Sequence, residues 1–279
     1  MSEATPNQAQ APLTSYKGNR TPTTGNTFES PDDDELEHVI APDWMYPYDV
    51  NDIEGIHELR RRIRDAEEAL NGLKAWTELI KDHITFGNSG KVGKTVGIYN
   101  LNTAHDCVNR GTDYCQVGPD ECYAVRAEHR QVHPIHYRRR QEIIWDHIDA
   151  STFATAFKRI VRRKRNRVDA LRIPQSGDFR HQHDLLKAEE IARILQPQYK
   201  VYTYTASTWL DLSEADALTV NASNEHAAGA DRRFIVVEDT EDIPQNGIQC
   251  PKDLTDDIWC GQCQLCLDSD AGDIYTKKI

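Results

Sequence analysis

The sequence lacks the short motifs that would place it in a familiar class of hydrolase. It contains no HExxH helix of zinc proteases and no GxSxG turn of serine hydrolases. A long apolar segment and a signal peptide are also missing, so we expect a soluble, cytoplasmic protein without a membrane partner. The stretch from His181 to Asp184 could supply zinc ligands for hydrolysis, but such stretches usually belong to an ordinary polar surface.

Basic residues are outnumbered: 33 Lys and Arg stand against 45 Asp and Glu, giving a formal net charge of -12. This balance argues against general affinity for nucleic-acid phosphates. Basic side chains nevertheless gather between Lys158 and Arg167, on the outer face of an expected helix that begins near Ser151. This basic face is typical of a solvated helix surface, and a nucleic-acid contact is the alternative.

The seven cysteines cannot all pair, and a cytoplasmic protein keeps its thiols reduced. They divide into a group of three and a group of four. Cys260, Cys263 and Cys266 follow the C-x2-C-x2-C pattern, and Cys250 precedes them by ten residues. Four thiolates at this spacing can surround one zinc ion or one iron-sulfur cluster, and the spacing does not choose between the two.

The group of three lies in one loop and consists of Cys107, Cys115 and Cys122. Three ligands leave a coordination position open, which is typical of a reactive metal site. In an iron-sulfur cluster one iron would accept an outside ligand. In a zinc site the open position would hold water or a nearby histidine such as His105, His129 or His133.

The expected fold is α/β. Residues 1–50 are poor in large apolar groups and are predicted to be a disordered or loosely docked tail. Apolar residues at spacings of three and four predict one long amphipathic helix over residues 51–85. The remainder, residues 86–279, alternates short apolar runs with helical segments, which predicts a partial (β/α) barrel of about six mostly parallel strands. The strands are expected at 95–101, 170–174, 201–204, 217–220, 234–237 and 247–250.

Polar residues follow several of these strands directly. Because the carboxyl ends of parallel strands meet at one edge of a sheet, we expect these side chains to converge with Cys107 and to contact a cofactor. The candidate cofactor-binding residues are Ser176, Gly177, Asp178, Thr205, Ser207 and Asn221.

These motifs resemble those of the phage-encoded gene product 88 family. The resemblance rests on Cys122-Tyr123-Ala124 at the end of the cysteine loop, Ser176-Gly177-Asp178-Phe179 after a strand, the strand 201–205, and Cys250-Pro251 with the last three cysteines. It covers about residues 95–268. If the gene is viral, the expected location is the host cytoplasm.

The cysteine pattern of that family is similar to a divergent form of the radical S-adenosylmethionine (SAM) enzymes. The resemblance implies a [4Fe-4S] cluster on Cys107, Cys115 and Cys122, with SAM on its open iron and an electron donor as partner. It implies that Asp178, the candidate catalytic residue, contacts the methionyl amine of SAM. It further implies an auxiliary cluster on the four later cysteines. The substrate, a small molecule or a macromolecule, is not indicated. The alternative function is a zinc-binding protein that contacts nucleic acid through residues 158–167.

Overall fold

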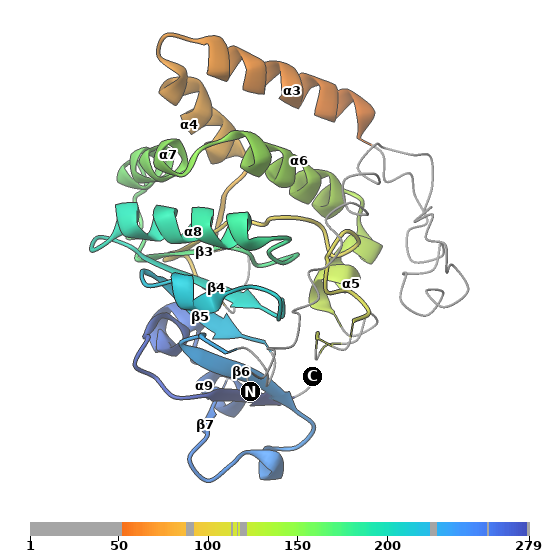
Figure 1. The fold of residues 1–279 in the computed structure, drawn as a ribbon, viewed down its shortest axis with the longest axis vertical. Helices are drawn as coiled ribbons and strands as arrows, with labels where there is room; N and C mark the ends of the chain where they lie inside the picture. Colours follow the sequence, from red (N-terminus) through yellow and green to blue (C-terminus); the bar gives the residue numbers. More distant parts are fainter. Residues whose placement is uncertain are drawn as a thin grey trace, which may run out of the picture.

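An open sheet of eight strands runs through the molecule in the order β1-β2-β3-β4-β5-β6-β8-β7 (Figure 1). The computed structural model describes residues 52–87, 92–112, 114–115, 117, 122–223, 228–255 and 257–277, so the tail predicted over residues 1–50 lies outside the described residues. The strands are β1 Thr85–Phe86, β2 Val96–Ile98, β3 Ala170–Arg172, β4 Lys200–Thr205, β5 Leu218–Ala222, β6 Arg232–Val237, β7 Ile248–Gln249 and β8 Ile274–Lys277.

All six expected strands are present, and their pairing is parallel as predicted. The sheet is larger than predicted because two strands were missed. β1 is only two residues long and pairs antiparallel with β2. β8 lies near the end of the chain and inserts between β6 and β7. The fold is therefore mixed α/β with an open, mostly parallel sheet, and a six-stranded barrel is not confirmed.

The single long helix predicted over residues 51–85 is wrong, because the described chain forms two helices there, α3 Ile53–Glu68 and α4 Gly72–Asp82. Ala69 is extended and ends α3, and a Cβ atom on Gly72 would lie 2.1 Å from the Ala66 carbonyl oxygen. The chain reverses at this point, and Arg62 forms an ion pair with Asp82 at 2.9 Å. The heptad spacing identified the buried side of both helices but could not show the reversal between them.

The other helices are α5 Tyr123–Arg130, α6 His133–His147, α7 Ala150–Arg162, α8 Gln182–Leu195, α9 Pro251–Leu254 and α10 Cys260–Cys263, with 3-10 turns at η2 Leu212–Glu214, η3 Thr240–Asp242 and η4 Leu265–Leu267. The helix expected to begin near Ser151 is α7, which begins at Ala150; its N-cap is Asp149, whose side chain accepts a hydrogen bond from the Thr152 amide at 2.8 Å. None of the helices in the described ranges is long and apolar enough to cross a membrane.

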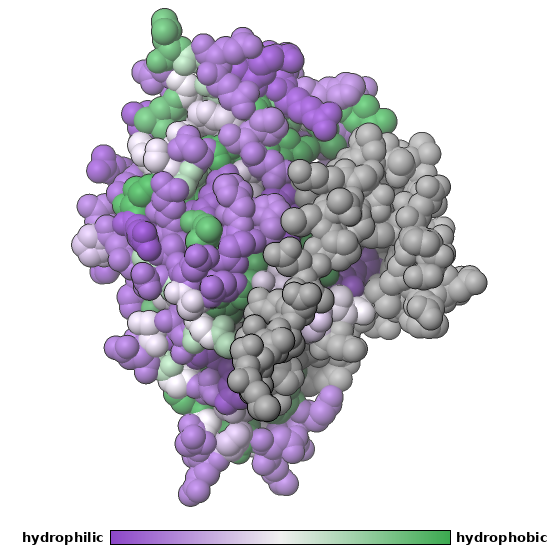
Figure 2. Space-filling model, viewed as in Figure 1, coloured by the Kyte–Doolittle hydropathy of each residue, from purple (hydrophilic) through white to green (hydrophobic). Residues whose placement is uncertain are grey.

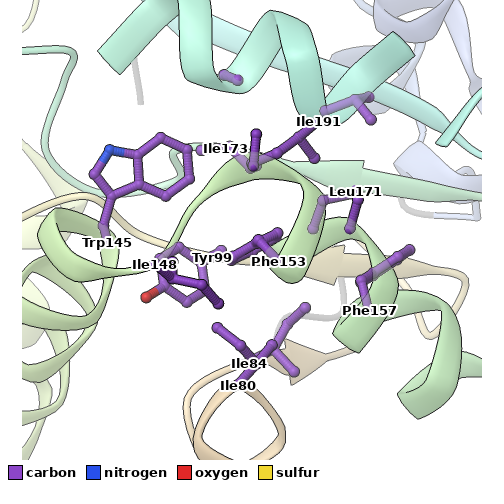
Figure 3. Packing of buried hydrophobic residues seen from close by; sticks show 14 of the residues in the cluster. Ile80, Ile84, Tyr99, Trp145, Ile148, Phe153, Phe157, Leu171, Ile173 and Ile191 are labelled. Atoms are coloured by element: carbon purple, nitrogen blue, oxygen red, sulfur yellow. The ribbon is translucent and has the colours of Figure 1, made fainter. Parts of the chain in front are cut away.

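The two faces of the sheet are covered by different parts of the chain. Leu171, Val201 and Val220 belong to the main core with the helices, where Tyr99, Trp145 and Phe153 meet edge to face or tilted (Figure 3). The alternate strand residues Ala170 and Tyr202 pack instead with Leu267 from the segment that carries the last cysteines, and Cys266 lies against them. Alternation along each strand thus assigns one face to the helices and the other to the four-cysteine segment.

The surface of the described residues is mainly hydrophilic in the view of Figure 2, which agrees with the acidic composition.

Replacing Phe157 by Ala tests the main core. This side chain is fully buried and contacts the Phe86 and Tyr199 rings. We expect the free energy of unfolding, measured with urea, to fall by about 3–5 kcal/mol because the cavity cannot be refilled. Leu70→Ala is the control, since Leu70 is fully exposed between α3 and α4. Its effect should stay within about 0.5 kcal/mol, and equal effects of the two variants would contradict this description of the core.

Candidate metal centres

The chain leaving β2 is fastened to the carboxyl edge of the sheet by buried amide side chains. Asn100 accepts a hydrogen bond from the Ser176 amide at 2.8 Å and donates one to the Gln141 side chain at 2.9 Å. Asn102 donates to the Asp178 carbonyl oxygen at 3.1 Å. These bonds bring the start of the three-cysteine loop against the chain that follows β3.

The two ends of the three-cysteine loop are joined by Glu128 of α5. Its buried carboxylate accepts hydrogen bonds from the amides of Ala104 at 2.8 Å and His105 at 3.1 Å. It also pairs with Arg138 at 2.5 Å. Since α5 begins directly after Cys122, Glu128 fixes the distance between the start and the end of the loop.

Cys107, Cys115 and Cys122 gather within the loop. Burial raises the pKa of the Cys107 thiol well above its ordinary value, and the negative charges of Asp178, Cys115 and Cys122 raise it further. The pKa of Cys115 is raised by burial and by Cys122 and Asp178. The three thiols and Asp178 are therefore electrostatic neighbours, as expected from their place at the edge of the sheet.

The described residues do not contain a finished metal site. In the ranges given above, no group of three or more His, Cys, Asp or Glu side chains is arranged closely enough to hold a metal ion. None of the seven cysteines forms a disulfide, and each is partly buried. A metal in either group would have to draw the thiols closer together.

Asp178 is the centre of the hydrogen bonds at this edge. Its Oδ2 atom accepts from the Asn109 side chain and from the Ala206 amide, each at 2.7 Å. Its Oδ1 atom accepts from the Phe179 amide at 2.7 Å. Burial raises the pKa of Asp178 to about 6, although these donors and the Thr205 hydroxyl favour the charged form. Asp178 thereby joins the cysteine loop to the ends of β3 and β4.

Five of the six predicted cofactor-binding residues lie around this carboxylate. The Ser207 hydroxyl accepts from Asn109 at 2.8 Å, and the Ser207 amide donates to the Thr205 hydroxyl at 3.1 Å. Gly177 has a φ of 74°, and a Cβ atom there would lie 1.7 Å from the Asn102 side-chain oxygen, so a side chain would not fit. Ser176 completes the group, and its role and that of the others as cofactor ligands stay predictions.

Among the described residues, several buried polar atoms at this edge are unsatisfied, and the Asn102 side-chain oxygen is one of them. Within the part of the chain that the structure describes, the Asn109 side-chain oxygen and the Ser176 hydroxyl have no hydrogen-bond partner. Their residues are only 1% and 2% exposed. Unsatisfied buried polar atoms cost free energy and are often completed by a ligand or an ordered water.

Asn221, the sixth predicted residue, lies on β5 and serves the other cysteine group. Its side-chain amide donates to the Thr203 carbonyl oxygen at 2.9 Å and to the Cys266 carbonyl oxygen at 3.1 Å. It accepts from Arg232 at 3.3 Å. Asn221 thus holds the four-cysteine segment to the sheet.

The four later cysteines are carried on short turns. Cys250 precedes α9, Cys260 and Cys263 are the two ends of α10, and Cys266 lies in η4. Burial raises the pKa of Cys266 to about 11, and the charges of Cys260 and Cys250 add to this rise while a hydrogen bond from Tyr204 opposes it. Cys250, Cys260 and Cys266 thus interact electrostatically although they are spread over the segment.

The His181 to Asp184 stretch has a structural role. Asp184 is 1% exposed, pairs with Arg180 at 2.8 Å and accepts from the Trp145 indole at 2.8 Å. Burial opposes its ionisation, but Arg180 outweighs burial and lowers the pKa of Asp184. His181 caps α8 by accepting from the Asp184 amide. These contacts favour the reading of this stretch as part of the packing between α6 and α8.

The sequence profile of the gene product 88 family matches residues 71–268 of the chain, which is more than half of its length and includes all seven cysteines. The chain belongs to the gene product 88 family. The match to this family does not indicate radical chemistry, a cofactor or a substrate. Comparisons with curated proteins and with solved structures found no match.

Sequence reasoning missed the residues that hold the gene product 88 cysteines in place. Asn109 lies inside the three-cysteine loop, and Glu128 lies on the buried side of α5. Hydrophobic periodicity identifies buried apolar residues, so it could not identify this buried carboxylate. Arg232 is followed in β6 by Arg233 and gave little signal, whereas Arg172 gave a clearer one, since it is a charged residue in the otherwise apolar β3. Such a residue in a buried strand predicts a specific partner.

Glu128→Gln tests the closure of the loop. The amide keeps the shape but removes the charge that pairs with Arg138 and places a donor beside the Ala104 and His105 amides. We expect the free energy of unfolding to fall by about 3 kcal/mol and Cys107 to react faster with a thiol reagent under native conditions. The matched control is Glu67→Gln, because Glu67 is 46% exposed and pairs with His147 at the surface. Unchanged stability and thiol reactivity in Glu128→Gln would show that the loop is closed by other contacts.

Proposed function

We propose that this gene product 88 protein is an iron-sulfur enzyme of the radical SAM type, with a [4Fe-4S] cluster on Cys107, Cys115 and Cys122. The observation that supports it most is the placement of these three thiols with Asp178 at the carboxyl edge of a parallel sheet. That edge is where α/β enzymes of this topology carry their chemistry.

The donor set fits such a cluster. A set of three thiolates leaves one iron for an outside ligand, and thiolates are the ligands that iron-sulfur clusters use. When bound, a cluster of this type supplies the electron that cleaves SAM to a 5'-deoxyadenosyl radical. The gaps of seven and six residues between the cysteines are longer than in the common C-x3-C-x2-C pattern. In this proposal a longer loop brings the three thiolates to the metal.

The residues around the loop suit a polar, positively charged cofactor. The negative charge of Asp178 favours a cation nearby, and its own hydrogen bonds hold it in place. The unsatisfied atoms of Asn109 and Ser176 offer an acceptor and a hydroxyl for hydrogen bonds. In this proposal Asp178 positions the loop and stabilises the cofactor by its charge, while Asn109 and Ser176 make the direct contacts.

The four later cysteines form a second, closed centre in this proposal. Their thiol-only donor set fits an auxiliary [4Fe-4S] cluster, with zinc as the alternative metal. The segment packs on the face of the sheet opposite to the helices and is fixed there by Asn221 and Arg232. Its place on the face of the sheet opposite to the main helical core favours an electron-transfer or structural role.

Replacing one cysteine in each group tests whether the two centres are separate. From anaerobically purified protein, we expect Cys122→Ala to lose the iron and sulfide of the first centre and to keep the second. Cys263→Ala should do the reverse, which metal and sulfide analysis together with absorption spectra would show. If either variant loses all metal, or if neither changes the metal content, the two-centre proposal is wrong.

The second candidate function is nucleic-acid binding by the basic face, and the exposure of Arg162, Arg163 and Arg165 favours it. Other members of the face are used within the protein: Lys158 donates to the Ile194 carbonyl oxygen at 2.6 Å, and Lys164 lies 4.0 Å from the centre of the Phe86 ring. Replacing the three arginines together by Gln should reduce the salt dependence of DNA or RNA binding. Lack of retention of the unmodified protein at low salt would end this alternative.

A further inference from the structure

Arginines in the interior of this protein are usually paired with carboxylates. Arg138 pairs with Glu128 at 2.5 Å, Arg139 with Asp106 at 3.2 Å, and Arg180 with Asp184 at 2.8 Å. This is the expected pattern, because a guanidinium removed from water needs a compensating negative charge.

Arg172 and Arg232 depart from this pattern. In the described part of the chain neither forms an ion pair with a carboxylate. The Nε atom of Arg172 donates to the Pro174 carbonyl oxygen at 3.2 Å. Arg232 is 3% exposed and donates to the Leu265, Asp268 and Ala271 carbonyl oxygens and to the Asn221 side chain. These neutral acceptors satisfy hydrogen bonds but supply no negative charge to Arg172, whereas Arg232 also interacts electrostatically with the Asp231 and Asp273 carboxylates.

Both arginines lie against the four-cysteine segment. The Arg172 guanidinium lies 4.5 Å from the centre of the Tyr204 ring. Burial lowers the pKa of Arg172, and its electrostatic interactions with the Tyr123, Tyr202, Tyr204 and Cys260 side chains raise it above its ordinary value. Tyr204 in turn hydrogen-bonds the thiol of Cys266. Arg172, Tyr204 and Cys266 are therefore linked by successive contacts on one face of the sheet.

A metal bound by the four cysteines would supply the missing negative charge. Four thiolates around Zn²⁺, or around an oxidised [4Fe-4S]²⁺ core, carry a net charge of about -2. The Arg172 guanidinium would balance part of this charge. In the metal-free protein the four protonated thiols are neutral and give the guanidinium no negative partner. Second-shell groups of this kind commonly adjust metal affinity and the basicity of the ligands.

We propose that Arg172 is a counter-charge of an anionic metal-thiolate centre on Cys250, Cys260, Cys263 and Cys266, and that Tyr204 donates its hydroxyl hydrogen to the Cys266 thiolate. This inference rests on the second centre of the proposed function. It is independent of whether the three-cysteine loop supports radical chemistry, and it holds for zinc and for iron.

The test uses cobalt as the probe, since Co²⁺ replaces Zn²⁺ in thiolate sites and gives a thiolate charge-transfer absorption. The full-length protein carries Cys122→Ala to impair the first group, and its metal-free form is titrated anaerobically with Co²⁺. We expect Arg172→Gln to weaken Co²⁺ binding about 10- to 100-fold, in the range typical of second-shell changes. Arg172→Lys keeps the charge and should lose less. Arg167→Gln is the matched control, because Arg167 lies just before β3 and its side chain is 87% exposed. This variant should bind Co²⁺ as the parent does.

A second measurement separates charge balance from a general structural role. Urea unfolding with and without Co²⁺ gives the stabilisation due to the metal. We expect Arg172→Gln to reduce this stabilisation more than it reduces the stability of the metal-free protein. Equal Co²⁺ affinity in the parent and Arg172→Gln would overturn the inference and leave the four-cysteine centre standing, and equal losses in the Lys and Gln variants would also overturn it. An absorption band that is absent from the parent, or unaffected by Cys263→Ala, would overturn the inference and the four-cysteine centre together.

Discussion

The buried Asp178 carboxylate is the constraint on which the candidate site depends. It accepts hydrogen bonds from the cysteine loop through Asn109, from the chain after β3 through Phe179, and from the chain after β4 through Ala206. Parallel pairing brings these strand ends to one edge, but pairing alone leaves the loops free to point elsewhere. The carboxylate joins them, and Glu128 closes the loop from the opposite side. These two buried carboxylates therefore restrict the path of the loop that carries the three thiols.

The two cysteine groups lie in opposite electrostatic surroundings. Cys107 and Cys115 have Asp178 as their charged neighbour, whereas Cys260 has Arg172 and the segment that carries Cys266 has Arg232. A negative neighbour favours a positively charged ligand beside the first group. Positive neighbours favour an anionic metal-thiolate centre in the second. This difference is consistent with an open, reactive centre in the first group and a closed, supporting centre in the second. The two groups of cysteines in the sequence therefore correspond to the two roles proposed for them.

Much of the fold could be predicted from the sequence because hydrophobic periodicity reports burial directly. The runs at Ala170 and Val201 predicted strands, and polar residues after them, such as Asp178 and Ser207, predicted the edge where they meet. The turn between α3 and α4 could not be predicted, since the two helices continue the same apolar spacing across Gly72. β8 was missed because a short strand that pairs between β6 and β7 is defined by distant partners. Asn221 was expected to converge with Cys107, but it contacts the segment that carries Cys266. The sequence indicates where a strand ends, but it does not indicate which segment packs against that end.

X-ray absorption at the iron and zinc edges of anaerobically purified full-length protein tests the central claim most directly. The account predicts iron with a sulfur first shell and a neighbouring iron atom, in an amount that exceeds what the four later cysteines alone can bind. Zinc with a sulfur shell and no iron would keep the four-cysteine centre and contradict the iron-sulfur enzyme. Iron or zinc bound through nitrogen and oxygen atoms, or protein without metal, would contradict both centres.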